Sequence, residues 1–242
     1  MRRIENIGFG GMKLIQDTDN FRYGLDAVIL ADFACSISKE FECAVDLGTG
    51  TGVIPFIMSH KNEYADFVGI EIQKELLKLA EESCRLNGLE ERISFMNIDV
   101  AEIDDLSIGD IRPDVVTCNP PYFIRGGGIP AKNPGRFISR HETSAVLDDF
   151  VKAASLLLGG KGDFFMVHRP SRLVDIFCSC RQNGLEPKDI RFVMPRAGEV
   201  PNIALIHCTA GGGRELSIMK ELCVYESDGR YTDEIMRIYE RK

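Results

Sequence analysis

The feature that most constrains the fold is a short apolar run followed by three closely spaced glycines. Residues 43–47 form the apolar run, and Gly48, Gly50 and Gly52 follow it before a second apolar run begins at Val53. The first run predicts a buried strand and the second predicts a helix. Glycines between them let a ligand approach the backbone closely and leave N–H groups free at the start of the helix. This order is typical of a ligand-binding turn in an α/β fold.

The spacing of the glycines restricts the kind of ligand. The loop reads G-x-G-x-G, whereas the dinucleotide fingerprint G-x-G-x-x-G would need a glycine at Val53. A nicotinamide dehydrogenase therefore fits the fold but not the spacing. The loop by itself identifies no ligand, because many glycine turns bind nothing.

Polar side chains end four successive predicted strands. The strands cover residues 43–47, 66–71, 92–98 and 114–118, and the polar residues are Asp46, Glu71, Asp99 and Asn119. Open α/β sheets build their sites outside the carboxyl ends of such strands. A carboxylate roughly 20 residues after the glycine loop is placed to accept both hydroxyls of a ribose. The alternative for Glu71 is an acid that favours the N-terminus of the helix after it.

The segment Asn119-Pro120-Pro121-Tyr122-Phe123 predicts a second part of the site. Two consecutive prolines fix φ and remove two backbone donors, so the Asn119 side chain and the nearby carbonyls are held as acceptors. Tyr122 adds a flat aromatic face. Acceptors beside an aromatic plate suit a planar group that carries an NH2. The alternative is a proline-stiffened loop with an aromatic plug.

A basic stretch follows this segment in an acidic chain. The formal net charge is −8, yet residues 124–142 carry acids only at their far end and contain Arg125, Lys132, Arg136 and Arg140. A basic loop beside the site suits a phosphate backbone. The alternative is an ordinary solvated surface loop.

The remaining pattern predicts further helices and strands of a single domain over residues 1–242, with residues 1–40 as an N-terminal helical or hairpin extension packed on it. Residues 190–194 and 204–208 are expected to pair as antiparallel strands at the end of the sheet, and residues 216–225 fit a strand or a helix equally well. The other predicted elements are helices over residues 73–87, 147–158, 170–183 and 233–240 and a strand over residues 163–168.

Composition excludes several classes of protein. The chain has no apolar run near the ~20 residues that span a bilayer and no signal peptide at its N-terminus, so we expect a cytoplasmic protein. The eight cysteines are scattered through apolar runs and contain no C-x-x-C pair, and the four histidines are dispersed. Neither a disulfide framework nor a metal site is expected.

Together, residues 46–52, Glu71, Asp99 and residues 119–122 resemble the Rossmann-like class I methyltransferases that use S-adenosylmethionine. The resemblance implies a seven-stranded, mostly parallel sheet with an antiparallel last strand, and S-adenosylhomocysteine as product. It also implies that the glycine loop holds the methionine part of the cofactor, Glu71 the ribose and Asp99 the adenine amine. The residues expected to contact the cofactor are Asp46, Gly48, Thr49, Gly50, Gly52, Glu71, Ile72, Asp99, Val100, Asn119, Tyr23 and Gly24, and the catalytic set is Asn119, Pro120, Pro121 and Tyr122.

Segments outside the cofactor half narrow the resemblance. Residues 21–28, 119–123, 140–142, 167–173 and 231–232 look like those of the bacterial tRNA1(Val) adenine-N6 methyltransferase family. This similarity covers nearly the whole chain and implies an RNA partner, most simply tRNA, whose phosphates would be held by Arg125, Lys132, Arg136, Arg140 and His141.

Enzymes that methylate other amines use the same hydrogen-bond acceptors on the Asn119 side chain and the carbonyls around Pro120, which we call the acceptor cup. An rRNA guanine-N2 or a protein glutamine-N5 methyltransferase is the nearest alternative, and the basic loop favours RNA over protein. A non-catalytic RNA-binding factor that retains a cofactor site is an alternative of another class, although the intact acid series and Asn119 segment argue against it. The sequence leaves open whether the protein is a monomer or a homodimer.

Overall fold

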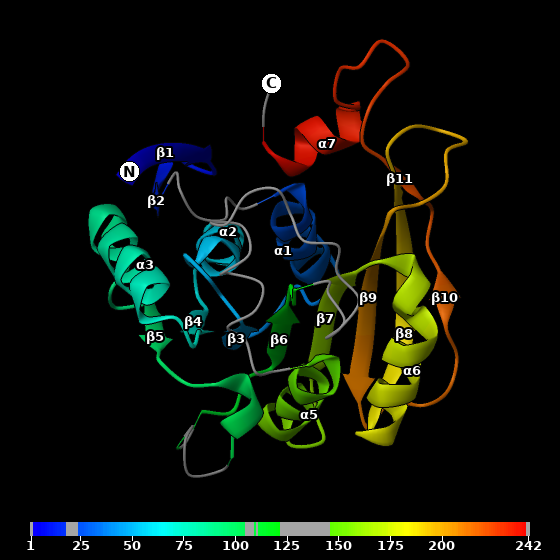
Figure 1. Cartoon of the computed structure of the whole chain (residues 1–242), viewed down its shortest axis with the longest axis horizontal. Coiled ribbons are helices and arrows are strands. Elements are labelled where there is room, and N and C mark those ends of the chain that lie inside the picture. Colours follow the sequence, from blue (N-terminus) through cyan, green and yellow to red (C-terminus); the bar gives the residue numbers. More distant parts are fainter. Residues whose placement is uncertain (1, 18–23, 105–108, 110, 122–145, 241–242) are drawn as a thin grey trace, which may run out of the picture.

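The computed structural model describes residues 2–17, 24–104, 109, 111–121 and 146–240. An N-terminal hairpin precedes a large mixed sheet with helices on both faces (Figure 1). The helices are α1 (Leu25–Ile37), α2 (Val53–Lys61), α3 (Lys74–Asn87), α5 (Leu147–Leu158), α6 (Leu173–Gln182) and α7 (Asp233–Ile238), with short 3-10 turns at Val100–Glu102 and Pro170–Arg172. The strands are β1 (Arg2–Gly8), β2 (Met12–Asp17), β3 (Cys43–Leu47), β4 (Asp66–Ile70), β5 (Ile93–Met96), β6 (Val115–Cys118), β7 (Asp163–His168), β8 (Leu185–Met194), β9 (Ile203–Ala210), β10 (Ser217–Ile218) and β11 (Leu222–Cys223).

The sheet has the predicted topology and two additional short strands. Its seven longer strands lie in the order β5-β4-β3-β6-β7-β9-β8, and β9 is the one described strand of this sheet that runs opposite to the others. The two-residue strands β10 and β11 pair in parallel with β8 and bring the total to nine. The prediction of seven strands with an antiparallel last one is therefore confirmed for the main sheet. Residues 216–225, which the sequence left undecided, supply the extra pair.

Apolar residues fill both faces of the sheet. In β7, Phe165 and Val167 pack in the core that contains α1, α2 and the hairpin, whereas Phe164 and Met166 pack in the core under α5 and α6. A strand that is buried on both faces reads as a continuous apolar run because alternate side chains enter different cores. This layering leaves the carboxyl ends of the parallel strands as the place for a site.

The N-terminal hairpin β1–β2 packs on α3 and shares the core of the sheet. The backbone N–H of Ile15 donates to Ser83 Oγ at 2.9 Å, and Asn87 binds both the N–H and the carbonyl of Lys13, at 2.9 and 2.7 Å. Leu14 is fully buried in the same cluster as α1 and α2. The hairpin thus packs on the sheet and its helices, and the assignment of the whole chain to one domain stays a prediction.

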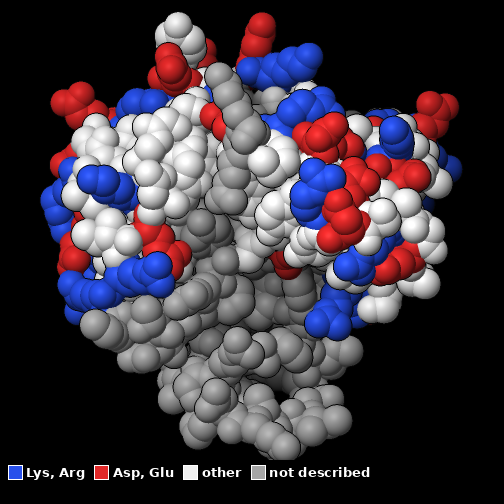
Figure 2. Space-filling model, turned by 90° about the horizontal axis from the view of Figure 1, so that it is seen from above, with Lys and Arg blue, Asp and Glu red and all other residues white. Residues whose placement is uncertain are grey.

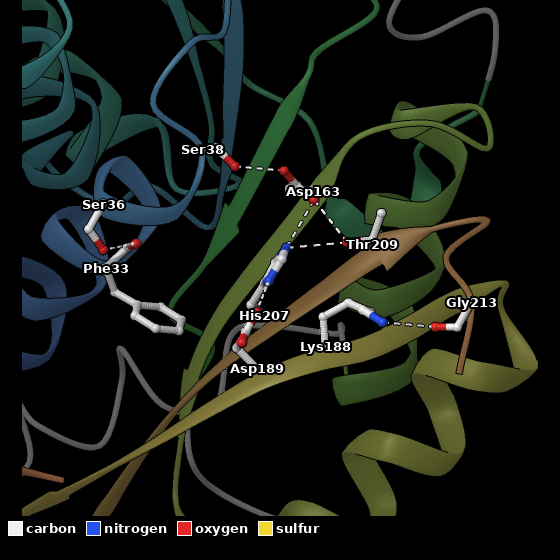
Figure 3. Close-up of polar contacts among 9 residues, drawn as sticks. All are labelled: Phe33, Ser36, Ser38, Asp163, Lys188, Asp189, His207, Thr209 and Gly213. Carbon is white, nitrogen blue, oxygen red and sulfur yellow. Dashed lines mark hydrogen bonds and ion pairs between the residues drawn. The ribbon is translucent and has the colours of Figure 1, made fainter. Parts of the chain in front are cut away.

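A buried histidine ties the antiparallel strand β9 to its neighbours (Figure 3). His207 Nε2 lies 2.9 Å from Asp163 Oδ1 on β7, and His207 Nδ1 lies 2.8 Å from Asp189 Oδ2 on β8. Burial alone would lower the pKa of His207, but its hydrogen bonds with the two carboxylates raise it. The hydroxyl of Ser38, just after α1, donates to Asp163 Oδ2 at 2.6 Å, so the network also fixes the end of that helix.

The surface carries charges of both signs. Figure 2 shows Lys and Arg side chains interspersed with Asp and Glu side chains on the described part of one face. The basic stretch predicted within residues 124–142 lies outside the described residues. No helix in the described ranges has the length and apolar character that crossing a membrane requires.

Candidate active site

The candidate site begins where four parallel strands end side by side. In the sheet, Leu47 of β3 pairs with Ile70 of β4 and with Cys118 of β6, and Ile70 pairs in turn with Met96 of β5. The residues that follow these ends are therefore neighbours at one edge of the sheet. They are Gly48, Glu71, Asn97 and Asn119.

The glycine loop adopts a conformation that requires glycine. Gly48, Gly50 and Gly52 all have positive φ, at 71°, 58° and 82°. The N–H groups of Gly48 and Thr49 donate to the carbonyl of Ile70 at 2.8 and 3.0 Å, which attaches the loop to β4. A Cβ atom built on Gly50 would meet nothing within 4 Å, so this side of the loop faces open space. The loop thus leaves room at Gly50 for a ligand to approach its backbone.

Asp46 is buried beneath this loop and is held by β6. Its Oδ1 accepts a 2.7 Å hydrogen bond from the hydroxyl of Thr117, and both side chains are almost fully buried. Burial raises the pKa of Asp46 to about 7, although interactions with the hydroxyls of Thr117 and Thr49 act in the opposite direction. Asp46 Oδ2 and Thr49 Oγ1 are buried and close enough to interact with each other, but neither makes a hydrogen bond of good geometry within the described structure. Buried polar atoms normally have partners, so these two atoms suit a ligand that brings donors, such as the ammonium of S-adenosylmethionine.

Glu71 connects the glycine loop to the start of α3. Its Oε2 accepts from the N–H of Gly50 at 3.0 Å, and its Oε1 accepts from the backbone N–H and the side-chain Nε2 of Gln73 at 3.0 and 3.4 Å. Burial raises the pKa of Glu71, and the hydrogen bonds from Gln73 and Gly50 oppose that rise. A carboxylate has roughly four acceptor positions. Binding both hydroxyls of a ribose would therefore replace some of these bonds, and the ribose role stays a prediction.

Asp99 lies three residues beyond the end of β5 and caps a short 3-10 turn. Its Oδ1 accepts from the N–H of Ala101 at 3.0 Å, and the next residue, Val100, is buried. Ile72 is half-buried beside Glu71. The structure thus brings Asp46, Glu71 and the glycine loop into direct contact, and it places Asp99 after the neighbouring strand. The cofactor contacts of these residues are not tested by the geometry and stay predictions.

Asn119 and the two prolines follow β6 directly, beside the glycine loop. Asn119 is half-buried, Pro120 is buried and Pro121 is exposed. Gly24, another predicted cofactor contact, is the N-cap residue of α1. The other predicted residues lie outside the described part of the chain, and they are Tyr23, Tyr122, Arg125, Lys132, Arg136, Arg140 and His141.

Three residues at this edge had no predicted role. Asn97 donates from Nδ2 to the carbonyls of Glu71 and Ile72, at 2.8 Å each, and so fixes the loop after β4. Thr117 holds Asp46, as described above. His168, at the end of β7, is buried and accepts from the N–H of Arg169 at 2.8 Å. Burial lowers the pKa of His168 to about 4, so this imidazole is neutral at physiological pH. The sequence placed Asn97 inside the strand expected over residues 92–98, so it gave no signal for this role.

Comparisons with known proteins agree with this fold. A family model described as "Methyltransferase domain" matches residues 40–157. A solved structure from Agrobacterium tumefaciens, described as a predicted O-methyltransferase, has a TM-score of 0.72 at 21% identity and covers 89% of this chain and 95% of its own. An S-adenosylmethionine-dependent methyltransferase from Clostridium acetobutylicum has a TM-score of 0.54 at 13% identity and covers 77% of this chain and 92% of its own. Residues 40–157 therefore match a methyltransferase domain, and the chain has the fold of class I S-adenosylmethionine-dependent methyltransferases.

Curated relatives confirm the narrower resemblance. A protein of Tolumonas auensis is 22% identical over 92% of this chain and 90% of its own length, and one of Aeromonas hydrophila is 23% identical over 96% and 95%. One of Porphyromonas gingivalis is 29% identical over 64% of this chain and 61% of its own. All three are named tRNA1(Val) (adenine(37)-N6)-methyltransferase. The similarity extends beyond the methyltransferase domain into both ends of the chain.

Proposed function

We propose that this protein transfers a methyl group from S-adenosylmethionine to the exocyclic N6 amine of an adenine in tRNA. The observation that carries the proposal is the position of Asn119 and Pro120. These residues follow β6 directly, beside the glycine loop that follows β3. The names of the curated relatives support tRNA as the acceptor. A tRNA substrate would place this activity in the cytoplasm.

The acceptor groups on Asn119 and Pro120 explain how an unreactive amine is made to react. The lone pair of an adenine amine is delocalised into the ring, so the nitrogen is a weak nucleophile. The side-chain oxygen of Asn119 and the carbonyl of Pro120 would accept its two N–H groups, aim the lone pair and favour a pyramidal nitrogen. No strong base is needed before attack, because the nitrogen loses its proton readily once it carries the methyl group.

The residues around the glycine loop fit the cofactor, which supplies a methyl group on a positively charged sulfur. Asp46, Thr49 and the backbone of Gly48, Gly50 and Gly52 would hold its methionine part, since two buried acceptor atoms there make no hydrogen bond of good geometry within the described structure. Glu71 with Ile72 would hold the ribose, Asp99 with Val100 the adenine, and Tyr23 with Gly24 would cover the site. Tyr122 would stack on the target base, and Arg125, Lys132, Arg136, Arg140 and His141 would hold phosphates.

The test is transfer of labelled methyl from S-adenosylmethionine to unmodified bacterial RNA, followed by nucleoside mass spectrometry. N6-methyladenosine in the tRNA fraction is the expected product. N2-methylguanosine in rRNA would keep the class of enzyme and overturn the substrate. No methylated RNA, with the cofactor still bound, would overturn the proposal in favour of a protein acceptor or a non-catalytic binder.

Substitution of Asn119 separates chemistry from cofactor binding. We expect Asn119→Ala to lower kcat by about 100-fold or more, because one of two positioned acceptors is lost. The affinity for S-adenosylmethionine, measured by calorimetry, should stay within a few-fold. Asn119→Asp is the matched control, because it keeps an acceptor oxygen in place and should retain more activity than Asn119→Ala. An equal loss of cofactor affinity and turnover would instead make Asn119 a structural residue.

A further inference from the structure

Four aromatic rings from the two ends of the chain form a continuous stack, which we call the tyrosine ladder. Phe9 at the hairpin turn lies 6.4 Å from Tyr239, Tyr239 lies 6.0 Å from Tyr231, and Tyr231 lies 5.2 Å from Tyr225, all measured between ring centroids. The interplanar angles are 29°, 17° and 13°, so the rings are close to parallel. Figure 1 shows the elements that carry them, with α7 between the hairpin and β11.

The two ends of the ladder have different environments. Phe9 is 2% exposed, whereas Tyr225 is 36% exposed. Packing of the C-terminus on the hairpin explains the buried end, but it does not explain an aromatic ring kept at the surface. The guanidinium of Arg196 lies 5.9 Å from the centre of the Tyr225 ring, and its side chain is 47% exposed and contacts Glu199 at 3.5 Å. The outer end of the ladder is thus a tyrosine with a planar cation beside it.

The backbone holds this outer end rigidly. The N–H of Tyr225 donates to the carbonyl of Pro195 at 2.9 Å, and the N–H of Glu226 donates to the carbonyl of Arg230 at 2.8 Å. The N–H of Thr232 donates to the carbonyl of Val224 at 3.1 Å and closes the turn. A ring that is fixed before binding loses little conformational freedom when a ligand stacks on it.

The outer end of the ladder lies at the same edge of the sheet as Asn119. His168 at the end of β7 pairs with Ala204 of β9, and Ala204 pairs with Phe192 near the end of β8. Cys223 of β11 pairs with Met194, the last residue of β8, just before Tyr225. Four strand spacings separate β6 from β11, a distance of roughly 19 Å. Nucleotides that flank a base held at Asn119 would reach this surface.

The charges around Tyr225 favour a base over a phosphate. Glu226 and Asp228 are exposed on the same turn. Asp228 pairs with Arg230 at 2.8 Å, so that arginine is engaged, and Glu226 repels phosphate. A nucleobase brings no charge and stacks on tyrosine and on guanidinium.

We propose that Tyr225, supported by Tyr231 and flanked by Arg196, is a stacking site for an unpaired base of the RNA substrate near the methylated adenine. The inference rests on the proposed function, because it assigns a second contact to the same RNA. It adds a binding surface from the C-terminal part of the chain to the acceptor cup at the end of β6.

The test compares Tyr225→Ala with the wild type in methylation of tRNA and in binding of the same tRNA at a fixed salt concentration. Base–aromatic stacking contributes about 1–3 kcal/mol, so we expect KM and Kd for tRNA to rise by about 5- to 150-fold. Cofactor affinity should not change, and the variant should stay folded at the assay temperature although the lost stacking on Tyr231 lowers Tm. Tyr225→Phe should restore tRNA binding, because it keeps the ring. Tyr64→Ala is the matched control, since Tyr64 is 94% exposed and precedes β4 at the opposite edge of the sheet.

A second substitution tests the stacking site even if Tyr225→Ala folds poorly. Arg196→Gln removes the cation without touching the ladder, and it should weaken tRNA binding by a smaller factor. If the wild type methylates tRNA but neither Tyr225→Ala nor Arg196→Gln changes KM or Kd for tRNA, the stacking site is refuted and the proposed function stands. If the wild type methylates no tRNA, the proposed function and the stacking site both fail.

Discussion

In the protein without bound cofactor, the buried carboxylate of Asp46 should lower the free energy of unfolding, and the size of this effect should depend on pH. The carboxyl is almost fully buried and its pKa is raised from 3.8 to about 7. The folded state therefore binds this proton more tightly than the unfolded state, so stability falls as pH rises from about 4 to about 7. At about 1.4 kcal/mol for each pKa unit, ionising Asp46 costs up to about 4 kcal/mol at pH 8.

The substitution Asp46→Asn removes this cost and keeps an oxygen for the hydroxyl of Thr117. We expect the variant to unfold at a higher temperature than the wild type, with a gain in stability that grows by about 2–3 kcal/mol between pH 5 and pH 8. For a chain of this size, each kcal/mol corresponds to about 2–4 °C in Tm. Thermal unfolding of both proteins without cofactor, at both pH values, measures the gain.

Groups that titrate in both proteins, such as His207, contribute equally to both free energies of unfolding. Their contributions therefore cancel in the difference between variant and wild type. Asp66→Asn is the control, because it removes an aspartate that is exposed at the opposite end of β4. The variant should also bind S-adenosylmethionine more weakly, since it has lost the charge that would face the ammonium. A gain that is absent at pH 8, or equal at the two pH values, would refute the account of Asp46 as a costly buried carboxylate.

Two further predictions follow from close packing and from the buried histidine. A Cβ atom on Gly69 would lie 2.7 Å from both Phe95 and Thr49, so Gly69→Ala should displace the glycine loop. We expect a loss of about 1–3 kcal/mol in stability, measured by thermal unfolding, and weaker cofactor binding, measured by calorimetry. The pKa of His207 is raised, so its ion pairs stabilise the fold fully below pH 6.5 and are lost as pH rises through the raised value. Tm should therefore fall with rising pH in the wild type more steeply than in His207→Gln, and equal slopes would contradict this role.

Elements with strong local signals were predicted almost to the residue. The apolar run 43–47 and the helix 147–158 coincide with β3 and α5. Gly159 ends α5 with φ at 56°, a conformation that few other residues adopt. The sequence also placed Asp46, Glu71 and Asn119 at one edge, because parallel strands must end together.

Elements that depend on distant partners were predicted less well. The strand expected over residues 92–98 ends at Met96, because Asn97 turns its side chain to the carbonyls after β4. The strands expected over residues 190–194 and 204–208 extend to Leu185–Met194 and Ile203–Ala210, since each is lengthened by pairing with the other. Local apolar periodicity carries no information about such partners.

The candidate stacking site shows the same limit at the level of function. Tyr225 and Tyr231 are close in sequence, but Phe9 joins them only because the hairpin, α7 and β11 meet above the sheet. The proposed acceptor cup lies within the five consecutive residues 119–123, so the sequence alone indicates methyl transfer to an amine. Recognition of an extended RNA needs contacts that are spread along the edge formed by the carboxyl ends of the parallel strands. The order of the strands in the sheet decides which residues lie along that edge. Substitutions in the cup should therefore change kcat, whereas substitutions at Tyr225 or Arg196 should change the KM for tRNA.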